Sequence, residues 1–340
     1  MTDPIEILIT LPFPEPLIAE LRKISPQLHI TVLKASHFED IPPDIWYRTQ
    51  VLYTNNVLPL TNEQAPNLKW IQFHWAGIDH ILDSALVKNP NIAVTTLSGS
   101  NASQVAEHIL MMILSFGHHL PEFIALQQRA EWPRDRWERF SPIEVHGSTI
   151  GIIGYGSIGR QLARLLLPFK PTVLATKRDL MHPQDHDYTP AEQGDPEGEF
   201  VHRLYPIQAF RSMLKECDFV TVCVPKTPQT RNLVAEAEFD AMKPGAFLID
   251  VSRGGVVDHA SLIAALKERK IGGAALDVFP EEPLPQESPL WKLPNVIITP
   301  HISGITANYD RQAVELFTVN LNRYLNNEPL LNLFDLQRGY

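Results

Sequence analysis

Short apolar runs recur along this chain, and each is separated from the next by a segment long enough to hold a helix. In the N-terminal part, the runs that we predict to be strands are 5–9, 29–34, 50–54, 68–73 and 92–97. Between the first two runs, apolar residues of the stretch 17–24 recur at helical spacing. Because strands that alternate with helices are typical of a parallel sheet, this pattern predicts an α/β unit.

The same alternation continues further along, with predicted strands at 150–153, 172–176, 219–224, 246–251, 273–276 and 296–299. Helical stretches such as 261–269 lie between them, which predicts a second, doubly wound unit. The tail at 307–324 has the pattern of one helix whose apolar face carries Val314, Phe317, Leu321 and Tyr324. We expect this helix to pack on the first unit. That domain would then be discontinuous, with residues 1–101 and 305–340 flanking a second domain at 102–304.

Three segments interrupt the alternation. Residues 103–116 are apolar on most sides, so we predict a buried helix, between domains or subunits. Residues 121–146 are polar and aromatic, with Trp132 and Trp137 among several arginines, and we interpret them as a surface excursion anchored by aromatics. The alternative is a loop that covers a pocket. Residues 179–203, called the acidic loop below, are acidic and proline-rich, which predicts an inserted, solvated surface loop.

A glycine-rich run at 149–160 joins a predicted strand to a predicted helix. Its pattern is Gly154-x-Gly156-x-x-Gly159. In a dinucleotide site the first glycine permits a tight turn, the second lets a pyrophosphate approach the backbone, and the third lets helix and strand pack closely. The phosphates would bind the free N–H groups at the start of the helix. A purely structural glycine turn is the alternative.

Composition and charge narrow the class of protein. The chain has 340 residues, 44% of them apolar and 20% charged, which suits two ordinary globular domains. Its net charge of −10 argues against nucleic acid or an anionic membrane surface as the main partner. No apolar run reaches the ~18 residues of a membrane span, and the N-terminus lacks a basic signal-peptide region, so we expect a cytoplasmic protein.

Cysteine and histidine usage gives no sign of a disulfide or a metal site. Cys217 and Cys223 are the only cysteines, and both fall in an apolar strand-like region, which favours free thiols. His118 and His119 lack partners at metal-ligand spacing, so we predict no metal.

Polar residues follow each of the last three predicted strands. Arg253 follows the first, Asp277 and Glu282 follow the second, and His301 follows the third. The carboxyl ends of parallel strands share one edge, where open sheets bind ligands. Each residue alone is more often a surface charge or a loop residue. Together with the glycine turn they suit hydride transfer to a 2-keto acid. Arginine can hold the carboxylate, histidine can donate the proton, and a carboxylate can orient the histidine.

At these residues the chain resembles the D-isomer-specific 2-hydroxyacid dehydrogenases. The resemblance covers nearly the whole chain and rests on the segments 75–79, 99–107, 154–159, 224–230, 251–258, 277–283 and 299–304. It implies a Rossmann cofactor domain inserted in a flavodoxin-like substrate domain, both doubly wound parallel α/β sheets. It also implies a homodimer joined through the cofactor domains.

The resemblance further implies individual roles. Arg253 would bind substrate, Glu282 would pair with the histidine, and His301 would be the acid/base. Backbone N–H groups near Ala76 and Gly77 would receive the substrate carboxylate. Glutamate rather than glutamine at position 282 argues against the formate dehydrogenase branch.

Asp277 would hold the nicotinamide carboxamide, and Cys223, Pro225 and Ser252 would line the cofactor cleft. The full set of residues that we expect to bind the cofactor is Gly154, Tyr155, Gly156, Ser157, Ile158, Gly159, Lys177, Arg178, Cys223, Val224, Pro225, Thr230, Val251, Ser252, Arg253, Asp277, His301 and Gly304.

One position departs from the pattern of NAD-preferring relatives. Those proteins usually end the second strand of the cofactor domain with an aspartate that binds the ribose hydroxyls, whereas Lys177 and Arg178 stand here. Two cations in that place could pair with a 2′-phosphate, so we predict that NADP is preferred over NAD. The alternative is that both side chains point to solvent and NAD is used.

Two functions from different classes remain open. The first is a reductase of glyoxylate, hydroxypyruvate or a similar small 2-keto acid, with a bulkier acid as its variant. The second is a dinucleotide-sensing binding protein, as in the corepressor branch of the same family.

Overall fold

The computed structural model describes residues 4–339, and their contacts divide the chain into two compact units. The first unit consists of Met1–Asn101, His186–Tyr188 and Thr306–Tyr340, and the second of Ala102–Asp185 and Thr189–Ile305. The first unit is therefore discontinuous, and three residues of the acidic loop belong to it. Tyr188 in that loop donates its backbone N–H to Asn332 Oδ1 at 3.0 Å.

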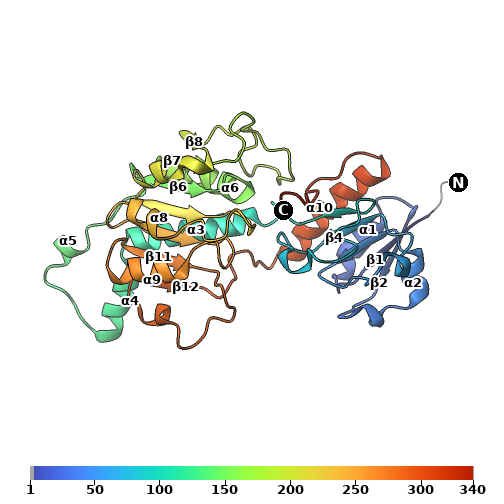
Figure 1. Ribbon diagram of the computed structural model, residues 1–340, viewed down its shortest axis with the longest axis horizontal. Coiled ribbons are helices and arrows are strands. Elements are labelled where there is room, and N and C mark those ends of the chain that lie inside the picture. Colours follow the sequence, from blue (N-terminus) through green and yellow to red (C-terminus); the bar gives the residue numbers. More distant parts are fainter. Residues whose placement is uncertain (1–3, 340) are drawn as a thin grey trace. The chain divides into compact units, whose positions relative to one another are not determined.

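The first unit is built on one parallel sheet in the order β2-β1-β3-β4-β5. Figure 1 labels β1, β2 and β4 of this sheet. Its strands are β1 (Ile5–Ile9), β2 (Leu28–Val32), β3 (Val51–Thr54), β4 (Trp70–Phe73) and β5 (Ala93–Thr95). Its helices are α1 (Glu15–Arg22), α2 (Pro43–Arg48) and α10 (Tyr309–Leu325). This strand order is that of flavodoxin-like folds, so the predicted fold class is confirmed for this unit.

Both faces of this sheet are covered. Successive residues of a strand point to opposite faces, and in β1 Ile7 lies in one buried cluster while Leu8 lies in another. The first cluster also contains Phe317 and Leu321 of α10, which packs on the sheet with the apolar face that the sequence predicted. The C-terminal helix thus completes a core that begins near the N-terminus.

The second unit has a seven-stranded parallel sheet in the order β12-β11-β10-β9-β6-β7-β8. Figure 1 labels β6, β7, β8, β11 and β12 of this sheet. Its strands are β6 (Thr149–Ile153), β7 (Thr172–Thr176), β8 (Arg203–Tyr205), β9 (Phe219–Val222), β10 (Phe247–Asp250), β11 (Gly273–Leu276) and β12 (Val296–Ile298). Its helices are α3 (Ala102–Gly117), α4 (Leu120–Arg129), α5 (Arg136–Arg139), α6 (Ser157–Leu166), α7 (Phe210–Leu214), α8 (Glu236–Ala241) and α9 (His259–Lys267).

The strand order of the second unit reverses next to β6, because β7 and β8 lie on one side of it and β9 to β12 on the other. This is the Rossmann arrangement, and ligands of such sheets bind where the order reverses. The helix α3 is largely buried and packs beside α6, with Ile109 and Ile113 fully enclosed. The prediction of a buried helix here is confirmed.

Two predictions about surface segments hold only in part, since most residues of 121–146 and of the acidic loop are exposed or half-buried, as predicted, but their details differ. Residues 121–146 contain most of α4 and all of α5, and Trp132 and Trp137 are 83% and 78% exposed, so neither tryptophan anchors the segment. The acidic loop is also less solvated than predicted, because Gly194 and Asp195 are buried. Its last residue, Arg203, begins the edge strand β8, which the sequence analysis did not predict.

Two further sequence-based expectations can be compared with the structure. Both cysteines are free thiols, as predicted. Within residues 4–339, no single helix is long and apolar enough to cross a membrane; only α3 and α4 taken together, bent by 61°, reach that length and composition.

Candidate active site

The glycine turn after β6 has the geometry that its sequence predicts. Gly154 has a φ of +107°, which favours glycine, and its N–H donates to Thr176 Oγ1 at 2.9 Å. A Cβ on Gly159 would lie 2.5 Å from Gly154 O, so only glycine lets α6 pack this close to the turn. A Cβ on Gly156 would meet nothing within 4 Å, which leaves open space beside the backbone where the helix starts.

The first turn of α6 offers a site for phosphate groups. Gly156 precedes the helix, and the helix has no side-chain cap. The first N–H groups of an α-helix have no intrahelical partner, and those of Ser157 and Ile158 start this helix. Free N–H groups beside open space bind anions well, so these residues fit the pyrophosphate of a dinucleotide.

The segment after β9 lies against the glycine turn. A Cβ on Gly154 would be 2.8 Å from Val224 Cγ1, and the Cys223 thiol donates to Gly154 O at 3.1 Å. Burial raises the pKa of the Cys223 thiol to about 12, so this thiol stays protonated and is not a nucleophile. Thr230 Oγ1 donates to Pro225 O at 2.7 Å and closes the following turn. The set of residues predicted to bind the cofactor includes Cys223, Val224, Pro225 and Thr230.

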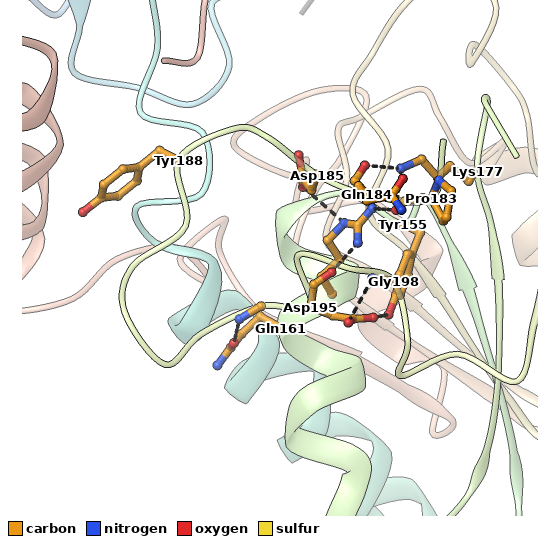
Figure 2. Close-up of polar contacts among 12 residues, drawn as sticks. Tyr155, Gln161, Lys177, Pro183, Gln184, Asp185, Tyr188, Asp195 and Gly198 are labelled. Atoms are coloured by element: carbon orange, nitrogen blue, oxygen red, sulfur yellow. Dashed lines mark hydrogen bonds and ion pairs between the residues drawn. The ribbon is translucent and has the colours of Figure 1, made fainter. Parts of the chain in front are cut away.

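Lys177 follows β7 directly and is only half-exposed. Its Nζ donates to two backbone carbonyls of the acidic loop, Pro183 O and Gln184 O, each at 2.9 Å (Figure 2). The side chain of Arg178 is exposed. Lys177 therefore does not simply point to solvent, which was the alternative that the sequence left open.

The acidic loop is fastened to α6 by a buried arginine that the sequence analysis missed. Arg160 is 1% exposed, and its guanidinium donates to the backbone carbonyls of Pro183 and Asp195. Its Nε lies 3.2 Å from Asp185 Oδ2, and its guanidinium carbon lies 4.8 Å from the centre of the Tyr155 ring. The sequence did offer one signal for this contact, since Arg160 directly follows Gly159, the last glycine of the motif. An arginine that is buried there needs hydrogen-bond acceptors from another segment.

Tyr155 was predicted to bind cofactor, but its hydroxyl has another partner. The ring is 4% exposed, and the hydroxyl donates to Asp195 Oδ2 at 2.5 Å (Figure 2). The backbone N–H of Tyr155 donates to Thr176 O at 2.9 Å, which ties the glycine turn to β7. Both hydrogen-bond donors of Tyr155 are thus used within the protein.

On the opposite side of β6, the loop after β10 carries Arg253. Val251 and Ser252 are buried, and the Ser252 hydroxyl donates to Asp250 Oδ1 at 2.5 Å. The Arg253 guanidinium donates to Ser252 O at 2.9 Å. Burial, together with the nearby Asp277, raises the pKa of the Asp250 carboxyl to about 7 despite the bonds from Ser252.

Asp277, after β11, holds the turn that follows β12. Its Oδ1 accepts from the Thr299 hydroxyl at 2.6 Å and from Ile302 N at 2.9 Å, and its Oδ2 accepts from Ser303 N at 3.0 Å. Burial alone would raise the pKa of Asp277, but the hydrogen bonds from Ser303, Thr299 and Ile302 outweigh it and lower the pKa. A fixed negative charge thus lies beneath the 299–304 turn, which ends at Gly304.

His301 and Glu282 form an ion pair on this turn. Glu282 Oε2 lies 2.7 Å from His301 Nδ1, and Glu282 Oε1 accepts from Phe279 N at 2.9 Å. The two side chains are 45% and 36% exposed, for His301 and Glu282 respectively. His301 has a φ of +53°, an uncommon conformation outside glycine, and the bonds to Asp277 hold its neighbours in place. A partner on Nδ1 leaves Nε2 to face a substrate.

A close backbone contact joins the loops that carry Arg253 and Glu282. A Cβ on Gly254 would lie 1.8 Å from Phe279 O, so the two loops touch backbone to backbone. The structure thereby connects the three predicted catalytic residues: Gly254 adjoins Arg253, Phe279 bonds to Glu282, and Glu282 bonds to His301.

Ala76 and Gly77 lie in the first unit, just after β4, and both are half-buried. His74, two residues before Ala76, is fixed on several sides. Its Nδ1 lies 2.8 Å from the Tyr53 hydroxyl, and its backbone oxygen accepts from the Tyr309 hydroxyl at 3.0 Å. Burial lowers the pKa of His74 to about 4, so its ring is neutral near pH 7.

The described residues 4–339 contain no cluster of three or more histidine, cysteine or carboxylate side chains that could hold a metal ion. The arginine, carboxylate and histidine of the second unit, with the glycine turn, fit an organic dinucleotide and an anionic substrate instead.

Comparison with known proteins agrees with this geometry. The family model for the NAD-binding domain of D-isomer specific 2-hydroxyacid dehydrogenases matches residues 110–303. A glyoxylate reductase from Thermococcus litoralis is 34% identical over 286 residues, which cover 83% of this chain and 81% of that protein. A D-3-phosphoglycerate dehydrogenase from Methanocaldococcus jannaschii is 32% identical over 274 residues, but this chain spans only 49% of its length.

Among solved structures, a D-isomer specific 2-hydroxyacid dehydrogenase from Xanthobacter autotrophicus Py2, in complex with NADPH and MES, has a TM-score of 0.81. It is 27% identical, and the match covers 100% of both chains. The two parallel sheets, the glycine turn and these relatives lead to one conclusion. The chain belongs to the D-isomer specific 2-hydroxyacid dehydrogenase family.

Proposed function

We propose that this protein is an oxidoreductase that transfers a hydride between a nicotinamide cofactor and a small 2-keto acid or D-2-hydroxy acid. The observation that carries the proposal is the 2.7 Å pair between His301 Nδ1 and Glu282 Oε2, on loops joined to the one that bears Arg253. A histidine oriented by a carboxylate, with an arginine on the neighbouring loop, is the set that carbonyl reduction needs.

In the proposed reaction, the Arg253 guanidinium binds the substrate carboxylate with paired hydrogen bonds and draws electron density from the adjoining carbonyl. His301 donates the proton from Nε2 to the carbonyl oxygen, and the Glu282 carboxylate stabilises the imidazolium before that transfer. The nicotinamide supplies the hydride to the carbonyl carbon when bound. Because His301 is 45% exposed, it can regain its proton from water.

The proposal assigns the dinucleotide to the glycine turn and the 223–230 segment of the second unit. It assigns to the N–H groups near Ala76 and Gly77 hydrogen bonds to the substrate carboxylate. Asp277 Oδ2 accepts one bond from the 299–304 turn, and a carboxylate oxygen can accept a second, from the nicotinamide carboxamide.

For the cofactor, the proposal is that NADPH is preferred over NADH. The support is Lys177, a cation held at the end of β7, where dinucleotide folds bind the adenosine ribose. The relative from Xanthobacter autotrophicus Py2 was solved with NADPH. Lys177→Asp should shift kcat/KM towards NADH by about tenfold or more, because it replaces a cation with an anion beside the 2′-phosphate. A variant that keeps the wild-type ratio would contradict the assignment.

The proposed substrates are glyoxylate and hydroxypyruvate, and the similarity to a glyoxylate reductase supports them. A bulkier 2-keto acid is the nearest alternative. A panel of 2-keto acids, each assayed with NADPH and NADH, tests both. If no acid in the panel oxidises either cofactor while the protein still binds the dinucleotide, the corepressor-like alternative replaces the enzyme.

We also propose a homodimer and keep the prediction of a cytoplasmic location. The exposed Trp132 and Trp137 on the segment around α5 support an interface that a monomer leaves uncovered. Analytical ultracentrifugation of the wild type and of a Trp132→Ser, Trp137→Ser double variant tests the assembly. Cell fractionation tests the location.

A further inference from the structure

Two cations of the second unit bind the same carbonyl oxygen. Pro183 O accepts from Lys177 Nζ at 2.9 Å and also from the Arg160 guanidinium. Like charges this close repel each other, and burial together with the nearby Arg160 lowers the pKa of Lys177. Asp185, near both cations, offsets part of this charge. Such a pair becomes more favourable when an anion binds beside it.

A buried aspartate orders the stretch of the acidic loop that lies against this carbonyl, since a Cβ on Gly198 would lie 2.9 Å from Pro183 O. Asp195 is 2% exposed, and its carboxylate accepts from the Tyr155 hydroxyl at 2.5 Å. It also accepts three backbone N–H groups of its own loop, from Gly198, Glu199 and Phe200, at 2.9–3.1 Å. Figure 2 labels Gly198 beside Asp195. A carboxylate with four donors holds a loop of this kind rigidly.

The same loop is bonded along α6. Gln161 Oε1 accepts from Gly194 N at 2.6 Å, and Arg164 Nε donates to Gly194 O at 2.8 Å. Arg160 donates to two backbone carbonyls of the acidic loop, Pro183 O and Asp195 O. Arg160, Gln161 and Arg164 thereby attach the loop to α6, the helix whose first turn fits the pyrophosphate.

These contacts hold the Lys177 side chain in place but do not occupy all of its N–H groups. An ammonium group has three protons, and the bonds to Pro183 O and Gln184 O use two of them. A lysine whose rotamer is already fixed loses less conformational entropy when it binds a ligand than a free surface lysine. The end of the second strand is where a Rossmann fold meets the ribose 2′ position.

We propose that the acidic loop is a device that positions Lys177 for the 2′-phosphate of NADPH, with Asp195 as its positioning residue. Asp195 holds Tyr155 and the loop backbone, Arg160 holds the Pro183 carbonyl, and that carbonyl fixes the ammonium. This inference rests on the proposed NADPH preference and adds to it. Cofactor choice depends on a residue that touches no cofactor atom.

The test measures affinity for 2′,5′-ADP and for 5′-AMP by calorimetry, without substrate. These probes differ only in the 2′-phosphate. Asp195→Asn removes one negative charge and two acceptor positions from the network. Glu197→Gln is the matched control, because it removes the same charge from an exposed position of the same loop. Tyr155→Phe removes a single hydrogen bond to Asp195 and serves where Asp195→Asn does not fold.

The wild type is expected to bind 2′,5′-ADP about tenfold or more tightly than 5′-AMP. Asp195→Asn should reduce that ratio about fivefold or more while 5′-AMP affinity stays within about twofold, and Tyr155→Phe should reduce it less. Glu197→Gln should keep the ratio or raise it slightly, since a nearby repulsive charge is gone. The ratio of kcat/KM for NADPH and NADH should follow the same order.

The proposal is overturned if folded Asp195→Asn and Tyr155→Phe proteins both keep the wild-type ratio, or if Glu197→Gln lowers it as much as Asp195→Asn does. A wild-type protein that binds both probes equally also overturns it, together with the NADPH preference. Reduction of 2-keto acids with NADH would survive that result, and 2′,5′-ADP binding would survive the absence of any reductase activity. The two failures are therefore distinguishable.

Discussion

The catalytic rim and the acidic loop are both held by ionic hydrogen bonds, but they differ in exposure. The catalytic rim consists of the loops that carry Arg253, Glu282 and His301. On the rim, His301 and Glu282 are 45% and 36% exposed. In the network of the acidic loop, Arg160 and Asp195 are 1% and 2% exposed. An exposed histidine can exchange protons with water between turnovers, as an acid/base must. A buried ion network does not exchange protons with water in this way. It fixes the geometry of its residues instead, which discrimination between similar cofactors requires.

This difference separates the two functions experimentally. Variants on the rim should change turnover and leave cofactor choice intact. Variants of the acidic-loop network should change cofactor choice and leave the proton-transfer step intact. The following predictions test that separation.

The largest effect is expected for Arg253→Ala. Loss of the guanidinium removes both carboxylate binding and carbonyl polarisation, so kcat/KM for the keto acid should fall by about 10³-fold or more. Steady-state kinetics with a saturating cofactor measures this. Near-normal kcat/KM in this variant would mean that the substrate carboxylate is bound elsewhere.

The next effect is expected for His301→Ala. Removal of the proton donor should lower kcat by about 10²- to 10⁴-fold. Cofactor affinity, followed by fluorescence titration, should remain close to that of the wild type. The separation of turnover from cofactor choice is contradicted if the variant retains turnover, or if its ratio of NADPH to NADH use changes instead.

A third prediction tests the backbone contact between the rim loops. In Gly254→Ala the new Cβ would lie 1.8 Å from Phe279 O, so one loop must move. The free energy of unfolding should drop by about 3 kcal/mol, and activity should fall with it.

Gly255→Ala is the control for that variant. Gly255 has a φ of +93°, but the nearest atoms to its added Cβ lie 3.9 Å away, on Lys226. This variant should lose only the ~1–2 kcal/mol of backbone strain. Equal losses in chemical denaturation would remove the close contact as the explanation.

The smallest effect concerns pH and the buried carboxyl behind Arg253. Burial raises the pKa of Asp250 to about 7, so between about pH 4 and 7 the folded state holds a proton that the unfolded state has lost. The free energy of unfolding therefore falls as pH rises through this window. Asp250→Asn has no carboxyl to ionise and lacks this loss. Its free energy of unfolding should therefore rise relative to that of the wild type, by on the order of a few kcal/mol across this pH range.

Asp258→Asn provides the opposite sign for comparison. Hydrogen bonds from Ser261 lower the pKa of Asp258, so this carboxylate contributes stability that is lost as pH falls. Denaturation curves of both variants from about pH 2.5 to 8 check the two directions, since the loss for Asp258 falls below its ordinary pKa. If Asp250→Asn follows the wild type in parallel across this range, Asp250 does not titrate near pH 7.

Much of the fold could be predicted from periodicity alone. Eleven of the strands in the described residues lie where short apolar runs predicted them, because parallel strands are buried on both faces and read as continuous apolar segments. The edge strand β8 was missed. It has only three residues, Arg203 is exposed, and the acidic sequence before it indicates a loop.

The candidate site was predicted less evenly. Residues that follow a strand, such as Arg253 and His301, could be found because the end of a strand fixes their place. Asp195 could not, since its partner Tyr155 lies 40 residues away and nothing local marks an aspartate in an acidic loop as buried. For Asp277 the sequence suggested a cofactor contact, and the structure adds its bonds to the turn that carries His301.

One measurement tests the central claim most directly: cofactor oxidation by the wild type and by His301→Ala, with glyoxylate and hydroxypyruvate, in NADPH and in NADH. The account predicts that the wild type reduces at least one of these acids faster with NADPH. His301→Ala should lose turnover with both cofactors by the same factor. A wild type inactive with both acids, or a His301→Ala protein with undiminished kcat, would contradict it.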